Sequence, residues 1–496
     1  MVHHADVHLR FEMEILAALC LHLALMAAFP STASTPDLPR TEPEELHAVY
    51  EIMSATGNEW ASRIPDVCRT RWHGIKCSQP DANNTLHVTE LSFGVLSDDT
   101  AFPACTNMEM AYISPAIARL PYLRRLFFYK CCISNPKPIP AEDIAKLGGS
   151  LEVLVLRQNG HTGAISARML ASLVNLHTLD LHGNSLSSSI PPSIGFLQNL
   201  VLLDLSHNHL FHELPRLLST LHSLRVLDLS FNRLQGLLTD DDISKFSNLY
   251  KLDLSHNMLS GSLPSVGFTH LQNLQLLDLS FNSFSGPLPP HLGLMASLQA
   301  LLLNNIGRLR SGIPVTLRHL SQLETLAITS VGLVGEIPDI FYGMDKLKVV
   351  RMDDNELTGL IPKSLGSLQQ LVELNLSNNR LIGGLPFSED VTRRLHGRLN
   401  INNNAGLCFH RNSQHSPVIL EGTHACTGMS GGPVILAEKI KGFHSSISNP
   451  REFVAQSNLF SSSPFLDSSS TNRHDAPFLV LSRVCILVVL VDLVSF

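Results

Sequence analysis

Residues 249–264 read Leu-Tyr-Lys-Leu-Asp-Leu-Ser-His-Asn-Met-Leu-Ser-Gly-Ser-Leu-Pro, and this stretch decides the fold. Its first nine residues form the pattern Leu-x-x-Leu-x-Leu-x-x-Asn, which recurs along the chain in steps of 24 or 25 residues. One such turn cannot bury its own leucines, whereas stacked turns bury them in one continuous core. The pattern therefore predicts a solenoid. Its last position falls at Asn159, Asn184, Asn208, Asn232, Asn257, Asn282, Ile306, Val331, Asn355, Asn379 and Asn404.

The composition also indicates one unit used many times. Leucine accounts for 85 of the 496 residues, aromatic residues for 6% and charged residues for 16%. A chain of this length ordinarily forms about three domains, but an excess of one apolar residue at fixed spacing favours a single repeat array. Two less regular turns, at 87–93 and 126–129, bring the prediction to about thirteen turns between Leu86 and Asn404. The net charge of -7 is spread thinly, which argues against a nucleic-acid partner.

A second motif, Ile-Pro or Leu-Pro, follows most of the Asn positions by about six residues, as in Gly359-Leu360-Ile361-Pro362. This motif resembles the signature of the plant-specific class of leucine-rich repeats. The resemblance implies a parallel β-sheet on the concave face and an extra strand at the side of the solenoid. We therefore expect an α/β repeat fold, namely a plant-type leucine-rich-repeat solenoid with disulfide caps at both ends.

The cysteines fit this expectation. The ends of a solenoid expose apolar side chains and must be covered, and the Trp and Cys residues of 60–77 resemble the N-terminal cap of extracellular plant repeats. Cys408 and Cys426 follow the last turn as a C-terminal pair. In an oxidising compartment we expect bonds between Cys68 and Cys77 and between Cys408 and Cys426.

Cys105, Cys131 and Cys132 lie between these two caps. Cys131 occupies the Asn position of its turn. Repeat geometry alone allows Cys131 to be a buried thiol, which leaves Cys105 to pair with Cys132.

The N-terminal turns are more specific than the middle repeats. They resemble the plant receptor-like proteins typified by Too Many Mouths and the Piriformospora indica-insensitive proteins, over residues 45–427 and most closely over 60–200. The resemblance implies a kinase-less surface receptor that partners receptor kinases, and it implies that Cys131 pairs with Cys105, which leaves one cysteine free. The segments that carry it are 91–94, Cys105, 126–131, 138–140 and 154–163.

The two ends set the expected compartment. Residues 15–29 form an apolar run before the small residues 31–33, which is typical of a secretory signal peptide that starts at Met1 or Met13. Residues 477–496 are apolar apart from Arg483 and Asp492, which fits a lipid-anchor signal or a membrane helix. We expect the extracellular side of the plasma membrane. The expected segments are a signal peptide (1–33), an N-terminal cap (34–85), the solenoid (86–404), a C-terminal cap (405–427), a disordered Ser-rich linker (428–476) and the anchor segment (477–496).

The sequence contains no convincing catalytic constellation. It lacks the glycine loop, H-R-D and D-F-G motifs of kinases. Residues 428–433 resemble the nucleophile segment of trypsin-like proteases, but Met429 stands where Asp is expected. His207, His209 and His212 fit repeat positions better than a metal site. We therefore predict no enzyme activity, no cofactor and no metal.

The outward positions of the predicted sheet give the binding hypothesis. Four turns repeat an Asp-x-Ser pair between residues 204 and 280, which we interpret as a neutral background. Departures from it cluster near the two breaks in the Asn ladder, and local departures in a regular repeat often mark function. We expect residues 302–354 of the concave face to contact a partner. The predicted partner-facing residues are Arg157, Gln158, Leu302, Asn304, Thr329, Ser330, Arg351, Asp353 and Asp354.

Two further surface features bear on partners. The sequons at Asn83 and Asn375 are candidate glycosylation sites, and Asn375 is predicted to face the concave side. The 24 histidines predict pH-dependent attraction of a partner, because imidazoles gain charge below a pKa near 6.5.

Together these features predict a kinase-less cell-surface receptor-like protein. It would bind a secreted peptide or a receptor-kinase ectodomain through its concave face and signal through that partner in development, defence or symbiosis. The alternative is a secreted inhibitor of a cell-wall-degrading enzyme. The apolar segment 477–496 favours the first interpretation.

Overall fold

The computed structural model describes residues 38–70, 72, 74–94, 104–105, 109–395, 397–409 and 424–425. All of them belong to one compact unit, which ends at Thr427. The expected signal peptide, Ser-rich linker and apolar anchor segment lie outside the described residues, as does Cys426.

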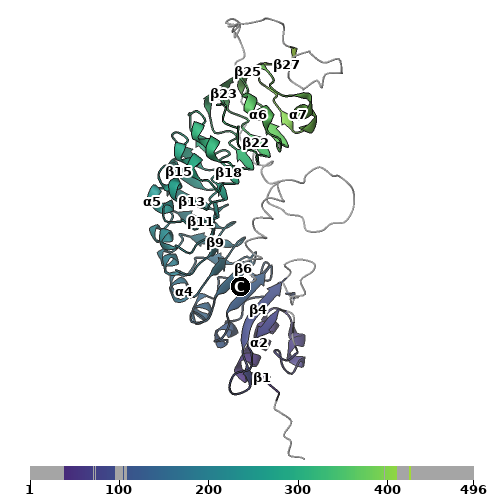
Figure 1. Cartoon of the computed structure of the whole chain (residues 1–496). Helices are drawn as coiled ribbons and strands as arrows, with labels where there is room; N and C mark the ends of the chain where they lie inside the picture. Colours follow the sequence, from purple (N-terminus) through teal and green to yellow (C-terminus); the bar gives the residue numbers. More distant parts are fainter. Residues whose placement is uncertain are drawn as a thin grey trace, which may run out of the picture. The chain divides into compact units, whose positions relative to one another are not determined.

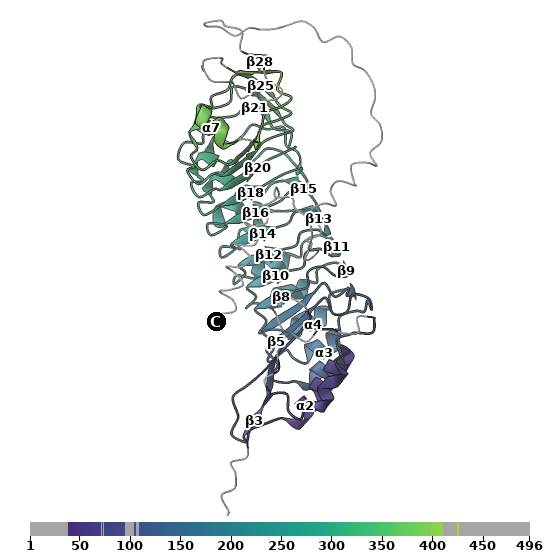
Figure 2. The same cartoon turned by 90° about the vertical axis from the view of Figure 1, so that its right-hand side faces the viewer.

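A single large β-sheet runs the length of this unit, and its strands stack in sequence order (Figures 1 and 2). Among the described residues it contains fourteen strands; β2 pairs antiparallel with β4, and the following pairs are parallel. The strands are β2 (Ile75–Cys77), β4 (Val88–Gly94), β5 (Arg125–Tyr129), β6 (Val153–Arg157), β8 (Thr178–Asp180), β10 (Leu202–Asp204), β12 (Val226–Asp228), β14 (Lys251–Asp253), β16 (Leu276–Asp278), β18 (Ala300–Leu302), β20 (Thr325–Ala327), β22 (Val349–Arg351), β24 (Glu373–Asn375) and β26 (Leu399–Asn400).

The strands pair without register slips through the middle turns, so equivalent repeat positions lie side by side. Leu203 faces Leu227, which faces Leu252, and all three side chains are buried. Because side chains alternate along a strand, the residues on either side of each buried leucine point away from the core. The outward residues of successive turns therefore form columns on the concave face.

The Asn at the end of a pattern ties its own turn to the preceding one. The Asn232 Oδ1 atom accepts the Leu210 N–H at 3.0 Å, and the Nδ2 atom donates to the Leu205 carbonyl of the preceding turn at 2.9 Å. The same Nδ2 atom also donates to the Leu229 carbonyl of its own turn at 3.1 Å. These bonds satisfy buried backbone groups where the chain leaves the strand.

The residue before each ladder position adopts a left-handed backbone conformation. The φ values are 53° at His207, 52° at Phe231, 54° at His256 and 55° at Phe281. Bulky residues adopt this conformation only where the surrounding structure imposes it. Here it turns the chain out of the concave sheet and places these side chains at the edge of that sheet.

Two further sheets form at the side of the solenoid, as the Ile-Pro motif implies. All of their strands except β28 begin one to three residues after a ladder position. The division between the two sheets falls between β19 and β21, at the turns where Ile306 and Val331 replace Asn. The first contains β7 (Thr162–Gly163), β9 (Ser185–Ser188), β11 (His209–His212), β13 (Arg233–Leu237), β15 (Met258–Ser262), β17 (Ser283–Ser285) and β19 (Gly307–Arg308); the second contains β21 (Val334–Glu336), β23 (Glu356–Gly359), β25 (Arg380–Gly384), β27 (Gly406–Phe409) and β28 (His424–Ala425).

Short helices form the convex side (Figure 1). Several begin at or next to a proline, whose fixed φ suits the first helical position. The α-helices after the cap are α3 (Ala141–Ala145), α4 (Ala167–Ser172), α5 (Asp240–Ile243), α6 (Lys363–Ser367) and α7 (Glu389–Arg394). The 3-10 helices there are η2 (Pro115–Arg119), η3 (Pro192–Phe196), η4 (Arg216–Thr220), η5 (Gly267–His270), η6 (Pro290–Leu294) and η7 (Val315–His319).

The N-terminal cap covers the first turns. It consists of β1 (Arg40–Thr41), which pairs with β3 (Thr85–Leu86), the helix α2 (Pro43–Ala55) and the 3-10 helix η1 (Glu59–Arg63). The ring centroids of Trp60 and Trp72 lie 4.9 Å apart. Within α2, the buried Glu45 carboxylate accepts the Val88 N–H at 2.6 Å, which fastens the helix to the first strand of the solenoid.

The disulfides follow the family resemblance. Cys68 bonds to Cys77, and Cys105 bonds to Cys131. The guess from repeat geometry alone, that Cys105 pairs with Cys132, is wrong: Cys132 is a buried free thiol. Burial raises the pKa of its thiol to about 12. Position in the repeat did not decide the pairing, because a buried residue at the Asn position can still reach a neighbouring segment.

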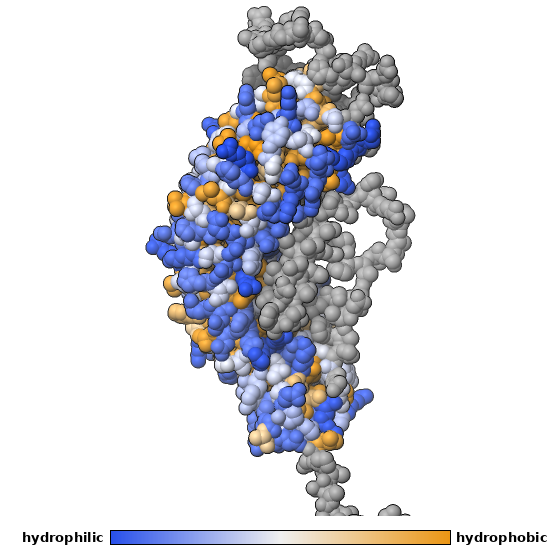
Figure 3. Space-filling view, in the orientation of Figure 1, coloured by the Kyte–Doolittle hydropathy of each residue, from blue (hydrophilic) through white to orange (hydrophobic). Residues whose placement is uncertain are grey.

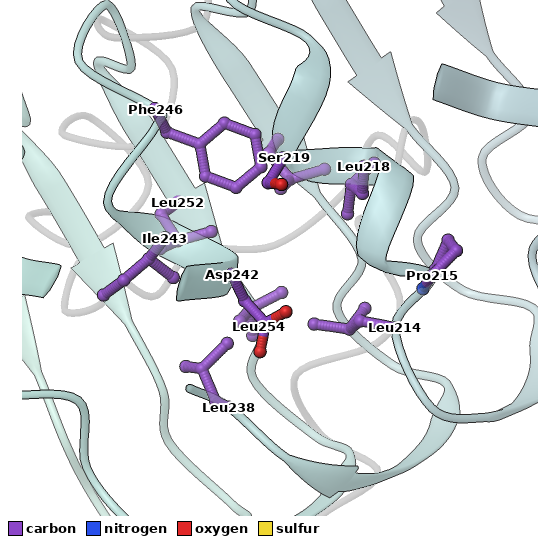
Figure 4. A pocket seen from close by; sticks show the side chains of 11 residues that line it. Leu214, Pro215, Leu218, Ser219, Leu238, Asp242, Ile243, Phe246, Leu252 and Leu254 are labelled. Carbon is purple, nitrogen blue, oxygen red and sulfur yellow. The ribbon is translucent and has the colours of Figure 1, made fainter. Parts of the chain in front are cut away.

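The solenoid interior is closely packed. A cavity of about 10 Å3 lies between Leu214, Leu218, Ile243 and Leu254 (Figure 4), which is room for at most one water molecule. An open hollow of about 480 Å3 lies beside Glu51, Met110 and Tyr112, near the end of α2. The interior cavity is too small for an organic ligand.

Candidate ligand-binding face

In the view of Figure 3, the flank of the solenoid that faces the reader is mostly polar, and its apolar residues lie in small separate patches. Among the described residues, no group of three or more His, Cys, Asp or Glu side chains could hold a metal ion. The described part of the chain also contains no helix that is both long and apolar enough to cross a bilayer. The concave sheet, with its columns of outward residues, is the candidate binding face.

Five aspartates form one column on this face, which we call the acidic column. They share a register position on five neighbouring parallel strands, about 4.8 Å apart. Like charges at this spacing repel strongly unless cations or protons intervene. The column consists of Asp180, Asp204, Asp228, Asp253 and Asp278.

Two cations lie along the acidic column. The Arg157 guanidinium is 3.3 Å from the Asp180 carboxylate and 3.8 Å from that of Asp204. The Lys251 ammonium is 2.7 Å from Asp228 and 3.7 Å from Asp253. Each cation therefore bridges two neighbouring turns. Serines two residues further on also donate to these carboxylates, in the bonds Ser206–Asp204, Ser230–Asp228 and Ser255–Asp253.

The pKa values in the column reflect burial and these charges. Burial, with the neighbouring Asp204 charge, raises the pKa of Asp180 to about 7. Burial also raises the pKa of Asp278 to about 6. At Asp228 burial acts in the same direction, but the Lys251 ammonium outweighs it and lowers the pKa. The column therefore titrates as a set of interacting groups.

A second column, the ring column, borders the first. It consists of His207, Phe231, His256 and Phe281, all at the left-handed position of their turns. Their ring centroids are 4.1, 3.9 and 4.1 Å apart, with interplanar angles of 11° to 15°. Such stacking adds to the burial of each ring. His182 caps the stack edge-on, 4.9 Å from His207, and its Nδ1 atom is 4.0 Å from the Asp204 carboxylate.

These imidazoles stay neutral well below neutral pH. Burial and the Arg157 charge lower the pKa of His182 to about 3. Burial, together with His207, lowers the pKa of His256 to about 4. The pKa of His207 is also lowered, chiefly by burial. Between pH 5 and 7, Asp180 and Asp278 therefore change charge, whereas His182 and His256 stay neutral.

We expect the unfolding free energy to have a broad maximum between about pH 4 and about pH 6.5. Between about pH 4 and about pH 7 folded Asp180 retains a proton that the unfolded chain has lost, so its contribution to stability falls across this range and changes no further above pH 7. Below pH 6.5 the unfolded chain protonates His182 and His256 while the folded state does not, which opposes the carboxyl effect and dominates below pH 4.

Denaturant titrations from about pH 3 to about pH 8 measure this profile. The stability of Asp180→Asn relative to the wild type should rise by about 1 kcal/mol per pH unit between about pH 4 and about pH 7 and stay level above it, because the variant lacks the carboxyl that holds a proton only in the folded state. A stability maximum above pH 7.5 would contradict the assignment of the column.

The predicted partner-facing residues fall on the concave face in two groups. Arg157 pairs with the first carboxylates of the acidic column, and Gln158 (φ 52°) occupies the left-handed position of the same turn as Arg157. Leu302 lies beside Asp278, in the column itself. The remaining six lie on the C-terminal half of the face: Asn304, Thr329, Ser330, Arg351, Asp353 and Asp354.

Hydrogen bonds link this second group from turn to turn. The Thr329 N–H donates to Asn304 Oδ1 at 3.1 Å, and its hydroxyl donates to Asp353 Oδ1 at 2.9 Å. The Arg351 guanidinium donates to Glu373 Oε1 at 2.5 Å. Asp354 accepts a bond from Asn378 of the next turn at 2.7 Å. The side chains are thus held in fixed positions on the sheet.

The sequence interpretation missed the acidic column. The Asp-x-Ser pairs seemed a neutral background, yet in register they place five carboxylates side by side with Lys251 among them. One signal was available: Lys251 stands where neighbouring turns have Val226 and Leu276. A lone cation at an apolar repeat position, next to repeated Asp residues, indicates a buried ion pair.

The two sequons differ in their surroundings. Asn83 is exposed in a turn before β3. Asn375 lies at the end of β24 on the concave sheet, half-buried, and its Oδ1 atom accepts the Ser377 hydroxyl at 2.8 Å.

Comparison with known proteins agrees with the fold. A leucine-rich-repeat family model matches residues 149–210 and 315–381, and a second matches 223–246, 248–268 and 273–295. The Arabidopsis receptor kinase HAESA, solved in complex with the peptide hormone IDA and the co-receptor SERK1, has a TM-score of 0.56. It shares 23% sequence identity over 74% of this chain and 62% of that one, which establishes the shared fold. This chain therefore has the fold of a leucine-rich-repeat solenoid protein.

Within that class, the chain resembles plant receptor-like proteins of the Too Many Mouths and Piriformospora indica-insensitive type, which confirms the expectation from the N-terminal turns. It is 55% identical to the Arabidopsis thaliana protein TOO MANY MOUTHS over 142 residues, 29% of this chain and 28% of that protein. It is 34% identical to Receptor like protein 29 over 150 residues, 30% of each. It is 31% identical to Piriformospora indica-insensitive protein 2 over 165 residues, 32% of this chain and 37% of that protein. The matches thus span about a third of these relatives.

Proposed function

We propose that this chain is a kinase-less receptor-like protein at the cell surface. It binds a secreted peptide or a receptor-kinase ectodomain through its concave face and signals through that partner. The observation that carries the proposal is the concave sheet itself: charged and aromatic side chains stand in register on it and are held by bonds between turns. A preorganised face of this kind loses little side-chain entropy on binding a partner.

Two further points support the proposal. The described solenoid has a tightly filled interior, as expected of a repeat protein that presents an extended binding surface. The relatives include a plant protein named as receptor-like. The leucine-rich-repeat receptor fold suggests a binding protein rather than an enzyme, and a protein with no kinase motif in its sequence signals through another chain.

We expect the exchange of charges at Arg351→Glu with Asp353→Lys to weaken partner binding about tenfold or more. The double change keeps the net charge but places a glutamate against Glu373 and removes the acceptor of the Thr329 hydroxyl. The measurement is biosensor binding of the full chain to a panel of plant receptor-kinase ectodomains and secreted peptides.

The matched control is Glu356→Arg with Arg380→Glu, an exposed ion pair of 2.9 Å between two strands of the lateral sheet. It also preserves net charge, and it should leave affinity within about twofold. Equal loss in both double variants would remove the concave face from the proposal.

Attachment to the membrane through residues 477–496 is part of the same proposal. We expect phosphatidylinositol-specific phospholipase to release the full-length protein from membranes of expressing plant cells. Retention after treatment would instead indicate a spanning helix. Recovery of the protein in the medium would favour the alternative function, a secreted inhibitor of a cell-wall-degrading enzyme.

A further inference from the structure

The acidic column and the ring column end at the same turn. Asp278 is the last carboxylate, and its partner on the next strand is Leu302. Phe281 is the last ring, and the left-handed position of the next turn is Asn305. Asp278 and Phe281 of this turn, together with Leu302 of the next, therefore form a boundary that combines a carboxylate, an aromatic ring and an aliphatic side chain.

The charges of the acidic column are unevenly matched at this boundary. Arg157 bridges the first two carboxylates and Lys251 bridges the next two. In the described part of the chain, no Lys, Arg or His nitrogen forms an ion pair with Asp278. Its oxygen Oδ1 accepts the Ser280 N–H at 2.9 Å. Each of the two cations bridges two carboxylates, so the fifth carboxylate, Asp278, has no bridging cation among the described residues.

The ring column presents an accessible end at the same place. The inner rings are sandwiched between neighbours, whereas the Phe281 side chain stacks on His256 on one side and is 43% exposed. The two columns run side by side, because each ring stands three residues after the aspartate of its own turn, as Phe281 does after Asp278. An aromatic ring beside a carboxylate attracts cations, because the ring face carries partial negative charge.

We infer that the boundary formed by Asp278, Phe281 and Leu302 receives an arginine or lysine side chain of the protein partner. This inference rests on the proposed function and names the chemistry that the partner brings. The guanidinium or ammonium group pairs with the Asp278 carboxylate, and its aliphatic stem covers Leu302 and the Phe281 ring. The incoming cation adds a third positive charge to the column, after those of Arg157 and Lys251.

Charge complementarity selects this occupant over others. The acidic column repels nucleic acids and anionic glycans. A metal ion requires several free oxygen ligands, and the other four carboxylates of the column are already paired with Arg157 and Lys251. A polypeptide with a basic side chain fits both the carboxylate and the apolar surface beside it.

The first test uses a defined probe, a fluorescein-labelled hexa-arginine peptide, titrated against the full chain by fluorescence anisotropy. We expect Asp278→Ala and Phe281→Leu each to weaken binding about fivefold, and the effect of Asp278→Ala to shrink at raised salt. The matched control is Asp241→Ala, which removes one carboxylate from the exposed part of α5 on the convex side. Equal weakening by Asp278→Ala and Asp241→Ala, or none by Phe281→Leu, would overturn the inference.

The second test separates this inference from the proposed function. The Asp278→Ala with Phe281→Leu variant is measured on the biosensor panel beside the wild type. If the wild type binds a panel member and the variant does not, the result supports both the inference and the proposed function. Equal binding by the two proteins overturns the inference and leaves the proposed function standing. If the wild type binds no member, the proposed function fails, and the hexa-arginine titration still decides whether the boundary accepts a cation.

Discussion

Lys251→Met is expected to lower the unfolding free energy by about 3 kcal/mol at pH 7.5. The Lys251 side chain is 17% exposed and lies between the Asp228 and Asp253 carboxylates, at 2.7 and 3.7 Å. Methionine keeps the aliphatic length but removes the charge, so two carboxylates remain close together in the acidic column without a cation. Chemical denaturation followed by circular dichroism measures the loss.

The pH dependence of this loss identifies its origin. At about pH 5.5 the unpaired carboxyls take up protons, because burial and mutual repulsion raise their pKa once the ammonium is gone. The destabilisation should then shrink by at least half. Replacing the carboxylates as well, with Asp228→Ala and Asp253→Ala, should restore most of the stability, since Ala327 occupies the same column in a later turn.

The control for this experiment is Lys146→Met. Its partner Asp143 lies at 3.0 Å, but the lysine side chain is 63% exposed, and such pairs contribute little. The change should cost less than about 0.5 kcal/mol. If Lys251→Met costs no more than Lys146→Met, the acidic column is not held together by its cations.

Asn232→Ala should cost about 3 kcal/mol. It removes the acceptor of the Leu210 N–H and the donor to the Leu205 and Leu229 carbonyls, all in the interior. Buried backbone groups left without partners bear the full cost of lost hydration. The comparison is Asn248→Ala, because exposed Asn248 donates one bond, to the His222 carbonyl at 2.9 Å. That change should cost less than about 1 kcal/mol, and similar losses at both positions would argue against the ladder as a source of stability.

The repeat pattern predicted most of the fold because one physical requirement recurs in every turn. Each Leu-x-Leu segment must bury its leucines, and each Asn must satisfy the backbone where the chain bends. The strands therefore follow the pattern even where Ile306 and Val331 replace Asn. The sequence shows the two breaks in the Asn ladder, but the division of the lateral sheets at those turns was not predicted, because it depends on bonds between turns.

The candidate site was harder to predict. Single turns gave no reason to single out Asp204 or Asp253, because their chemistry arises from neighbours 24 or 25 residues away in the sequence. Likewise, the sequence places His207, Phe231 and Phe281 at the same repeat position, just before the ladder Asn. Only the structure shows that the rings at this position stack. The predicted residues of 302–354 do lie on the concave face, and their contact with a partner remains a prediction.

The most direct test of the account is a glycan placed on one side of the solenoid or the other at two nearby positions in the sequence. Asp253→Asn creates the sequon Asn-Leu-Ser on the concave face, whereas Lys245→Asn creates Asn-Phe-Ser in the exposed segment after α5, on the convex side of the preceding turn. With glycosylation verified by mass, the concave glycan should abolish binding to the panel member that the wild type binds, and the convex glycan should leave it intact. Enzymatic release of the glycan by an amidase converts the asparagine to aspartate, so it regenerates Asp253 and should restore binding. Binding that survives the concave glycan and is lost with the convex one would contradict the account.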